Sequence, residues 1–368
     1  MGKRRNVFFY AAMSLLCMVM FSMGIRQAQA ASGGKITVSV ERFSLGQGYL
    51  IEPTEISFTQ GENFAQVFDR LMKQKGFTYR YNGRLTDGFY LESIDNADTG
   101  VLNIPRCIQN MPSVPNWDGT KVAPPTNENH TGNLEFPALG EFAYSKQSGW
   151  YYFVNNIAPG VGFSGTTVSN GDVIRVQFTV YGLGADLGAG YGESAQALKL
   201  PNRDAVTRKL AVMNGRPDSL KNAKWKKAYQ DALAAAANLD STPAQITAAE
   251  RALPTQTKID QWLKQQADSK KYTPKKMTLK TVKKSGTRKM KLTWKKVSSC
   301  SGYQIYMSVK KKSGYKKIKT VTQKKVTSYT KTKLKKGTKY YFKARAYRKV
   351  GKKTYYGAYS NIVSLKMK

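Results

Sequence analysis

The stretch SGWYYFVNNIAPGVGFSGTTVSNGDVIRVQFTVY, residues 148–181, decides the fold of the first part of the chain. Its aromatic and β-branched run at 150–154 suits a pleated strand, and Asn155-Asn156 can adopt the positive φ of a tight turn. Beyond a glycine-rich loop, residues 174–180 alternate between apolar and polar side chains, which is typical of a half-buried strand. One face of that strand should carry the apolar residues Ile174, Val176, Phe178 and Val180. The other face should carry the polar residues Arg175, Gln177 and Thr179.

The chain of 368 residues is long for one ordinary domain, and its charge is unevenly distributed. It carries 60 Lys and Arg against 23 Asp and Glu, a formal net charge of +37. Residues 271–368 hold 32 of these cations and no Asp or Glu, so nearly all the excess charge lies at the C-terminal end. We therefore predict about two to four modules, of which the last is strongly basic.

The N-terminus has the features of an export signal. Lys3, Arg4 and Arg5 precede an apolar run at 7–23, and Ala28-Gln29-Ala30 forms a small-x-small cleavage motif. We predict a signal peptide at 1–30, cleaved near Ala30; the alternative is an uncleaved membrane anchor, for which the apolar run is short. No later segment is apolar enough to span a membrane, so we expect a secreted or cell-wall-associated protein without a transmembrane segment in the mature chain.

Cys107 and Cys300 are the cysteines that remain after such a cleavage. They fall in different predicted modules, so we expect no bridge between them. An exported chain without a disulfide framework fits a Gram-positive bacterial wall better than an animal secretory pathway.

A first module is predicted at 31–187, with strands at 36–41, 77–81 and 89–94. A helix should begin near Asn63 and end at Gly76, because its apolar residues fall at helical spacing: Phe64, Val67, Phe68, Leu71 and Met72. Residues 95–147 are rich in Pro, Asn and Gly, with weak periodicity, and are expected to form a long excursion that is either functional or poorly ordered.

The motif block of this module resembles the transcobalamin-like C-terminal domain of Gram-positive surface proteins. The resemblance is carried by Gly149-Trp150-Tyr151-Tyr152-x-Val154-Asn155, by Gly160-x-Gly162-x-Ser164 and by Gly171-Asp172-x-Ile174. It implies a β-grasp fold. In the vertebrate carriers this domain closes over one face of cobalamin, while a helical barrel holds the other face. This chain has no such barrel, so no cofactor is expected, and cobalamin stays an alternative ligand.

The glycine-rich loop is the candidate ligand site of the first module, because an exposed loop of this kind allows close backbone approach. Trp150 and Tyr152 are interpreted as core residues of the β-grasp fold. The predicted ligand-facing rim consists of Phe153, Asn155, Gly160, Val161, Gly162 and Phe163.

Helices are predicted after a glycine-rich connector. The composition of 182–192 indicates a flexible segment, with the linker itself set at 188–193. A helical bundle follows at 194–269, with helices at 204–213, 219–238, 242–253 and 255–266. Its alanine-rich hairpin is similar to the helical-bundle repeats of bacterial surface proteins, which implies a spacer without a ligand.

The third module, 272–368, is predicted to be all-β. Short alternating strands recur at 277–282, 289–295, 302–308, 315–321, 327–331, 340–347 and 362–367. The segment Leu334-x-Lys336-x-Thr338-x-Tyr340 resembles the tyrosine corner of fibronectin type III domains. The predicted fold class is therefore multidomain: an α+β β-grasp module, a small α-helical bundle, and an all-β immunoglobulin-like (fibronectin type III) sandwich.

The basic module needs external counter-ions, because it contains no carboxylates of its own. Cell-wall polyanions such as teichoic acid are the favoured partner; anionic lipid head groups and a solvated face are alternatives, and nucleic acid is disfavoured. An excess of 29 Lys over 3 Arg favours diffuse attraction over bidentate recognition. The candidate polyanion-binding residues are Lys310, Lys311, Lys312, Lys316, Lys317, Lys335 and Lys336.

Catalysis has little support in the sequence. His130 is the one histidine, and no nucleophile–base set or metal-ligand spacing is visible around it. We therefore expect a non-enzymatic surface protein that works in binding or adhesion, with no metal. Two alternatives stay open: a small-molecule or glycan carrier with a corrinoid-like ligand on the β-grasp rim, and a structural wall component without a specific ligand.

Overall fold

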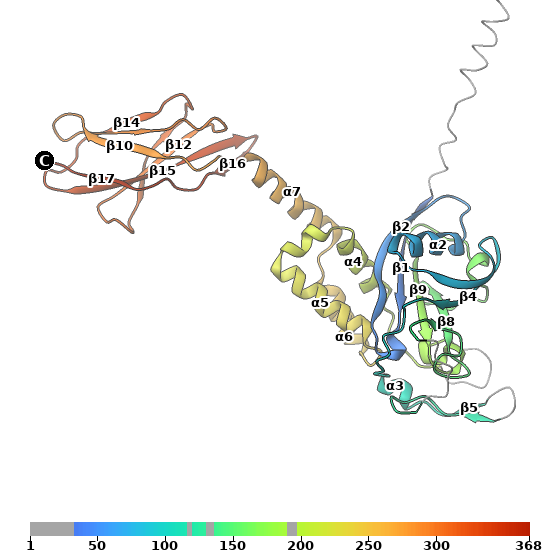
Figure 1. Ribbon diagram of the computed structural model, residues 1–368. Coiled ribbons are helices and arrows are strands. Elements are labelled where there is room, and N and C mark those ends of the chain that lie inside the picture. Colours follow the sequence, from blue (N-terminus) through green and yellow to red (C-terminus); the bar gives the residue numbers. More distant parts are fainter. Residues whose placement is uncertain (1–32, 116–119, 130–135, 190–196) are drawn as a thin grey trace, which may run out of the picture. The chain divides into compact units, whose positions relative to one another are not determined.

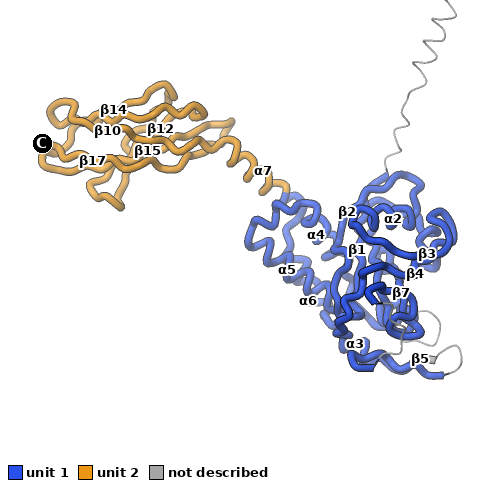
Figure 2. Tube along the Cα trace, viewed as in Figure 1, with its two compact units in different colours: residues 1–259 blue, residues 260–368 orange. Residues whose placement is uncertain are grey.

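The computed structural model describes residues 33–115, 120–129, 136–189 and 197–368. The chain divides into two compact units, Met1–Ile259 and Asp260–Lys368, which are coloured separately in Figure 2. The predicted signal peptide at 1–30 and the single histidine, His130, lie outside the described residues.

Unit 1 is built on a four-stranded mixed sheet in the order β2-β1-β9-β8. β1 (Gly34–Glu41) is parallel to β9 (Val173–Thr179) and antiparallel to β2 (Tyr49–Phe58), while β8 (Gly149–Val154) pairs antiparallel with β9. α2 (Phe64–Lys75) covers one face of this sheet (Figure 1). The predicted helix is confirmed, because Asn63 and Gln66 form a capping box and Gly76 ends the helix in the left-handed region.

A smaller sheet is formed by β3 (Tyr79–Arg84), β4 (Asp87–Ile94) and β7 (Leu139–Gly140). The segment between β4 and β7 contains α3 (Arg106–Gln109) and a short hairpin of β5 (Val114–Pro115) and β6 (Lys121–Val122). The described part of the excursion therefore contributes to the main core through isolated apolar side chains, which give no periodic signal: Ile104, Ile108, Met111, Leu139 and Tyr144.

The polar face of β9 is buried, so the prediction of a half-buried strand is wrong. All seven residues of β9 are buried, including Arg175, Gln177 and Thr179. The Arg175 guanidinium binds the Glu41 carboxylate with two bonds, Nη2 to Oε2 at 2.8 Å and Nε to Oε1 at 3.0 Å. Gln177 Nε2 donates to the same carboxylate at 3.1 Å. A buried charge is tolerated here because its partner and its hydrogen bonds are all present.

Four helices follow, and the first of them packs against the sheet that contains β9. α4 (Asp204–Asn214), α5 (Ala223–Ala237), α6 (Pro243–Ala252) and α7 (Gln256–Tyr272) agree with the predicted helices, and a 3-10 turn η4 (Pro217–Lys221) precedes α5. In Figure 1, α2 and α4 lie on opposite sides of the sheet. Asn214 Nδ2 donates to the Pro53 carbonyl of β2 at 2.7 Å. The sequence predicts a separate spacer bundle, whereas these contacts place α4–α6 in the same compact unit as the sheet.

Arg203 is a buried residue whose side chain binds carbonyl groups at the end of α5. It is 1% exposed, and it donates to three carbonyl oxygens at 3.0 Å, those of Pro201, Ala236 and Asn238. The Ala236 carbonyl belongs to the last turn of α5, and Asn238 follows that helix, where unsatisfied carbonyls favour a cation. Burial, together with the nearby Arg175, lowers the pKa of Arg203 to about 10. The guanidinium is therefore still charged at neutral pH.

Unit 2 is a two-sheet sandwich. One sheet contains β10 (Leu279–Lys284), β11 (Met290–Trp294) and β14 (Ser328–Lys331). The other has the order β13-β12-β15-β16, with β17 also pairing with β15: β12 (Gly302–Ser308), β13 (Lys316–Val321), β15 (Lys339–Val350), β16 (Lys353–Tyr356) and β17 (Val363–Lys366). The seven predicted strands are confirmed, and β16 is an additional strand that forms a hairpin with β15.

The tyrosine corner is present. The Lys335 backbone N–H donates to the Tyr340 hydroxyl at 2.9 Å. Trp294 is buried between the sheets and packs edge-on against Tyr303, with ring centroids 5.4 Å apart. These residues therefore form the core and the corner of the sandwich, as predicted.

Candidate functional site

An open cavity of about 270 Å³ lies beside the glycine-rich loop of unit 1. Its walls come from β4, from the segment before β8, from β8 and from the loop, and include Tyr90, Phe142, Trp150, Tyr151, Val161 and Leu183. Four of these side chains are large, apolar or aromatic, and well exposed: Tyr90, Phe142, Val161 and Leu183. Apolar walls with a few polar groups are the usual composition of a small-molecule site.

The polar part of this cavity is formed by Glu141 and Tyr90. The Tyr90 hydroxyl donates to the Glu141 carboxylate, and burial together with this carboxylate raises the pKa of Tyr90 well above its usual value. A neighbouring cavity of about 300 Å³ shares Glu141 and Phe142 and adds Arg80, Glu92 and Ser93. Phe142 therefore separates an apolar cavity from a polar one, and its φ of 61° is held by the bond from its N–H to the Ser148 carbonyl.

The structure places the predicted rim residues of this loop in different environments. Val161 and Gly162 line the cavity and are exposed. Gly160 is exposed next to them but lies outside the cavity wall. Asn155 is exposed at the hairpin turn, where its Nδ2 donates to Asp172 Oδ1 at 2.8 Å. Asn155 therefore holds the turn closed, and it is not one of the residues that line the cavity.

Two of the predicted rim residues, Phe153 and Phe163, are buried. Phe163 also borders the cavity, but it is only 5% exposed, because it packs against Phe64 with ring centroids 4.7 Å apart. Phe153 is 6% exposed and packs with Leu187 and Ala189. Both phenylalanines are therefore core residues; the glycine-rich loop does not leave them free, since other segments cover them.

The expected connector forms one wall of the cavity. Residues Gly182–Leu187 form a 3-10 turn, η3, in which Leu183 has a φ of 52° and Ala185 to Leu187 are buried. Asp186 is fully buried and accepts hydrogen bonds from the Thr179 hydroxyl and from the backbone N–H groups of Val180 and Tyr181. The prediction of a flexible segment is thus wrong for 182–189, because a buried carboxylate ties it to the end of β9.

We expect the stability of unit 1 to depend on pH through Asp186. Burial raises the pKa of Asp186 from 3.8 to about 7, although the hydrogen bonds that it accepts lower the pKa. Between these values the folded chain holds a proton that the unfolded chain releases, so this group's contribution to stability falls as the pH rises. From about pH 5 to about pH 8, wild type should lose about 2 kcal/mol relative to Asp186→Asn, measured by denaturant unfolding. Parallel pH profiles of the two proteins would contradict this.

Sequence reasoning missed Tyr90, Glu141, Phe142 and Leu183 as residues of the cavity. They belong to three segments that are distant in sequence, two of which were interpreted as an excursion and a connector. Glu141 and Phe142 lie in a stretch without periodicity, and Leu183 lies in a glycine-rich one, so no local pattern marks them. They become recognisable only after folding, as large apolar side chains that stay exposed around a carboxylate.

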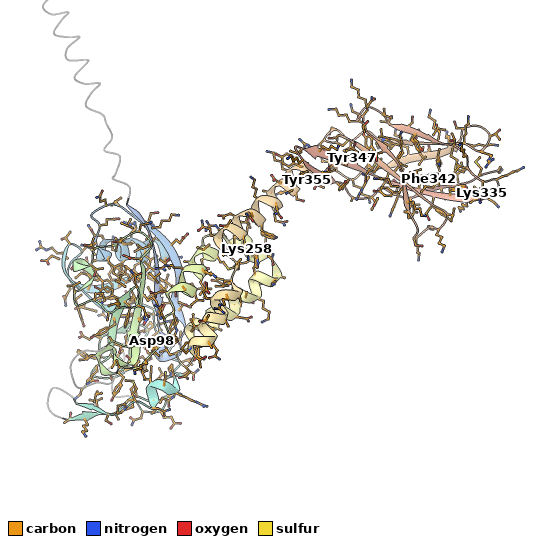
Figure 3. The ribbon with its side chains drawn as sticks, turned by 180° about the vertical axis from the view of Figure 1, so that it is seen from behind. Asp98, Lys258, Lys335, Phe342, Tyr347 and Tyr355 are labelled. Carbon is orange, nitrogen blue, oxygen red and sulfur yellow. The ribbon has the colours of Figure 1, made fainter. Side chains whose placement is uncertain are left out.

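The predicted polyanion-binding lysines of unit 2 are all exposed. Lys310, Lys311 and Lys312 lie in the connection between β12 and β13, and Lys316 and Lys317 begin β13. Lys335 and Lys336 lie in the connection between β14 and β15. Because Ser308 pairs with Tyr341 and Met307 with Lys316, both connections meet at one end of the sandwich. Figure 3 shows Lys335 at this end and Tyr355 toward the other.

Neither a metal site nor a membrane span is found in the part of the chain that the structure describes. Within these residues, no three His, Cys, Asp or Glu side chains are grouped so that they could hold a metal ion. No described helix combines the length and apolar character that a membrane crossing requires. Cys107 and Cys300 are both free thiols.

Comparison with known proteins identifies one part of the chain. The family model of the fibronectin type III domain matches residues 273–362. The chain therefore contains a fibronectin type III domain, a module common in adhesion and binding proteins. Among curated proteins, no sequence matches this chain.

Several solved structures are similar to about a quarter of this chain. A Fn3-like protein from Clostridium thermocellum is 26% identical over 24% of this chain and 88% of its own, with a TM-score of 0.19. The sixth fibronectin type III domain of human fibronectin type III domain containing protein 3 is 17% identical, and the match covers 26% of this chain and 85% of that one, with a TM-score of 0.22. A β-1,2-glucanase from Parabacteroides distasonis is 20% identical, and the match covers 26% of this chain and 13% of the glucanase, with a TM-score of 0.22.

Proposed function

We propose that this protein is an exported, non-enzymatic binding protein that its basic fibronectin type III domain holds to the anionic polymers of a bacterial cell wall. The observation that carries the proposal is the charge of that domain. Residues 271–368 contain 32 Lys and Arg and no Asp or Glu, on a fibronectin type III domain, which is a common module of binding proteins. Export rests on the N-terminal signal motif and its cleavage sequence at 28–30.

The physical argument is one of charge neutralisation. Without carboxylates in its own strands, the domain repels itself, and bound anions reduce this repulsion. The exposed lysines of the two connections concentrate that charge at one end of the sandwich. A phosphate-bearing polymer of teichoic-acid type supplies anions along a flexible chain, which suits lysines as mobile point charges.

The experiment compares two charge-matched variants of the full chain for binding to an immobilised polyol-phosphate polymer. The first changes to glutamine the seven exposed lysines of unit 2: Lys310, Lys311, Lys312, Lys316, Lys317, Lys335 and Lys336. The second makes the same change at seven exposed lysines of unit 1: Lys73, Lys75, Lys221, Lys224, Lys226, Lys227 and Lys258.

Because both variants lose the same net charge, only the place of the charge differs. The first variant should bind on the order of a hundredfold more weakly than wild type at low salt, since several phosphate contacts are lost together. The second should bind within about threefold of wild type. Equal losses in the two variants would remove the basic domain as the wall-binding part.

A second binding function is supported by the cavity of unit 1. Its two adjoining compartments have the size of single rings, and Tyr90, Phe142 and Tyr151 offer aromatic surfaces beside Glu141. This combination suits a neutral glycan or another small ring-bearing ligand. We also infer a β-grasp fold for the sheet of unit 1, from its strand order and from α2 across one face. A corrinoid is much larger than either compartment and could place only one edge there.

This function is tested by titrating the full chain with wall-derived oligosaccharides and with cobalamins, and by comparing Phe142→Ala. Saturable glycan binding that Phe142→Ala weakens about tenfold would support the cavity as the site, since the ring borders both compartments. Saturable binding of cobalamin alone would replace the glycan with the corrinoid. Binding that Phe142→Ala leaves unchanged would place the ligand elsewhere.

A further inference from the structure

The outer face of the sheet β13-β12-β15-β16 carries cations that are clamped by tyrosine rings. Along β15, Tyr340, Phe342, Ala344 and Ala346 are buried, so the residues between them face outward. Lys343 and Arg345 are two of these outward residues, and they meet four tyrosines from neighbouring segments. We call this set the cation–tyrosine ladder; it consists of Tyr306, Tyr315, Lys343, Arg345, Tyr356 and Tyr359.

Each cation of the ladder is fixed by more than one ring. Lys343 Nζ lies 4.0 Å from the ring centroid of Tyr359 and 4.4 Å from that of Tyr315. Arg345 Cζ lies 4.0 Å from the Tyr356 centroid and 5.2 Å from the Tyr359 centroid. Contacts of this length are attractive, and they hold side chains that are otherwise mobile.

Arg345 is also oriented by a hydrogen bond. Its Nε donates to Gln304 Oε1 at 3.0 Å, and the Tyr306 hydroxyl donates to the same oxygen at 2.8 Å. This bond uses Nε, so the two Nη groups remain as a pair of N–H donors with a fixed orientation, which we call the fork. No Asp or Glu exists in residues 271–368, all of which the structure describes, so no carboxylate of these strands neutralises the fork. A fixed guanidinium fork matches the oxygens of a phosphate bidentately, which the flexible lysines do not do.

We propose that the cation–tyrosine ladder is a specific phosphate-binding site for a polyol-phosphate polymer, which rests on the polyanion binding proposed above for this domain. Lys343 and Arg345 are two residues apart on one strand, so they lie about 7 Å apart along it. A polyol-phosphate chain has phosphodiesters at a similar spacing, so that one chain can meet both cations. The faces of the tyrosine rings are occupied by the cations, so little ring surface is left on which nucleic acid bases can stack. The site therefore favours a polyol polymer over nucleic acid.

The test uses the full chain and keeps its net charge constant. Arg345→Lys retains the cation but loses the fork, and the matched control, Arg348→Lys, alters an arginine that lies 5.1 Å from the Tyr272 ring, outside the ladder. Poly(glycerol phosphate) and an oligothymidylate of equal charge are titrated at low salt. Arg345→Lys should weaken poly(glycerol phosphate) binding about tenfold, and Arg348→Lys by less than about twofold. Near-ultraviolet circular dichroism checks that both variants are folded.

A third variant removes the support and leaves the fork. Tyr356→Leu takes away the ring closest to Arg345, and it should give an intermediate loss because the guanidinium is no longer held in place. Equal affinities for the Arg345→Lys and Arg348→Lys variants would overturn the ladder site but leave the wall-binding role of the domain intact. Tighter, Arg345-dependent binding of the oligothymidylate would replace the polyol polymer with nucleic acid. Failure of wild type to bind either polymer would overturn the proposed function itself.

Discussion

Replacing Glu41 with glutamine is expected to lower the free energy of unfolding of unit 1 by about 3–5 kcal/mol. The change leaves the Arg175 guanidinium buried without its charged partner, under helices that keep water away. Ser39 and Gln177 donate to the two different oxygens of the Glu41 carboxylate, and glutamine keeps one acceptor oxygen, so one of these two donors also loses its acceptor. Hydrogen exchange of the β1 and β9 amides in the full chain measures this effect in unit 1 alone.

A matched control shows whether the effect comes from burial. Glu62 binds Arg70 in a partly exposed ion pair, so Glu62→Gln should cost within about 1 kcal/mol. The double variant Glu41→Leu with Arg175→Met should recover most of the stability, because it removes both buried charges together. If Glu41→Gln lowers the free energy of unfolding as little as Glu62→Gln does, the polar face of the sheet is not shielded from water, which would contradict this account.

Binding of the full chain to a polyol-phosphate polymer is expected to weaken about a thousandfold between about 50 and 200 mM salt. The seven exposed lysines at one end of the sandwich each displace counter-ions from the polymer, and these effects multiply. Isothermal titration at several salt concentrations gives the slope of log affinity against log salt, which should be near −5 for about seven contacts.

The seven-lysine variant of unit 2 serves as the reference for that slope. It retains the other cations of the domain, so it should bind weakly and with a slope closer to zero. A wild-type slope as shallow as that of the variant would contradict electrostatic binding through these lysines. Ligand binding in the cavity of unit 1 depends on apolar contacts, so its affinity should change little over the same range of salt concentration.

The sandwich of unit 2 is largely predictable from sequence because its signals are local. Alternation marks each strand, Trp294 marks the core, and the spacing that ends at Tyr340 marks the corner. The additional strand β16 was missed because it is short and mostly polar, and the pairing with β15 stabilises it. The helices of unit 1 are predictable for the same reason, from caps such as Asn63 and Thr242.

The burial of the polar face of β9 could not be predicted from local patterns. Alternation shows that Arg175 and Gln177 point away from the apolar core, and it does not show that α4 packs against β9. The partner that makes this burial possible, Glu41, is 134 residues away. The same limit applies to the cavity, because Tyr90, Glu141 and Leu183 meet only in the folded chain. The ladder was missed because composition shows many lysines but does not show that rings clamp Lys343 and Arg345.

The most direct test of the wall-binding account is retention of the full chain on isolated Gram-positive cell walls, before and after chemical removal of their anionic polymers. Untreated walls should retain the protein at low salt, because the basic domain finds its counter-ions there. Walls stripped of these polymers should retain only background amounts. Equal retention on intact and stripped walls would contradict the account, since the protein would then be held by something other than anionic polymers.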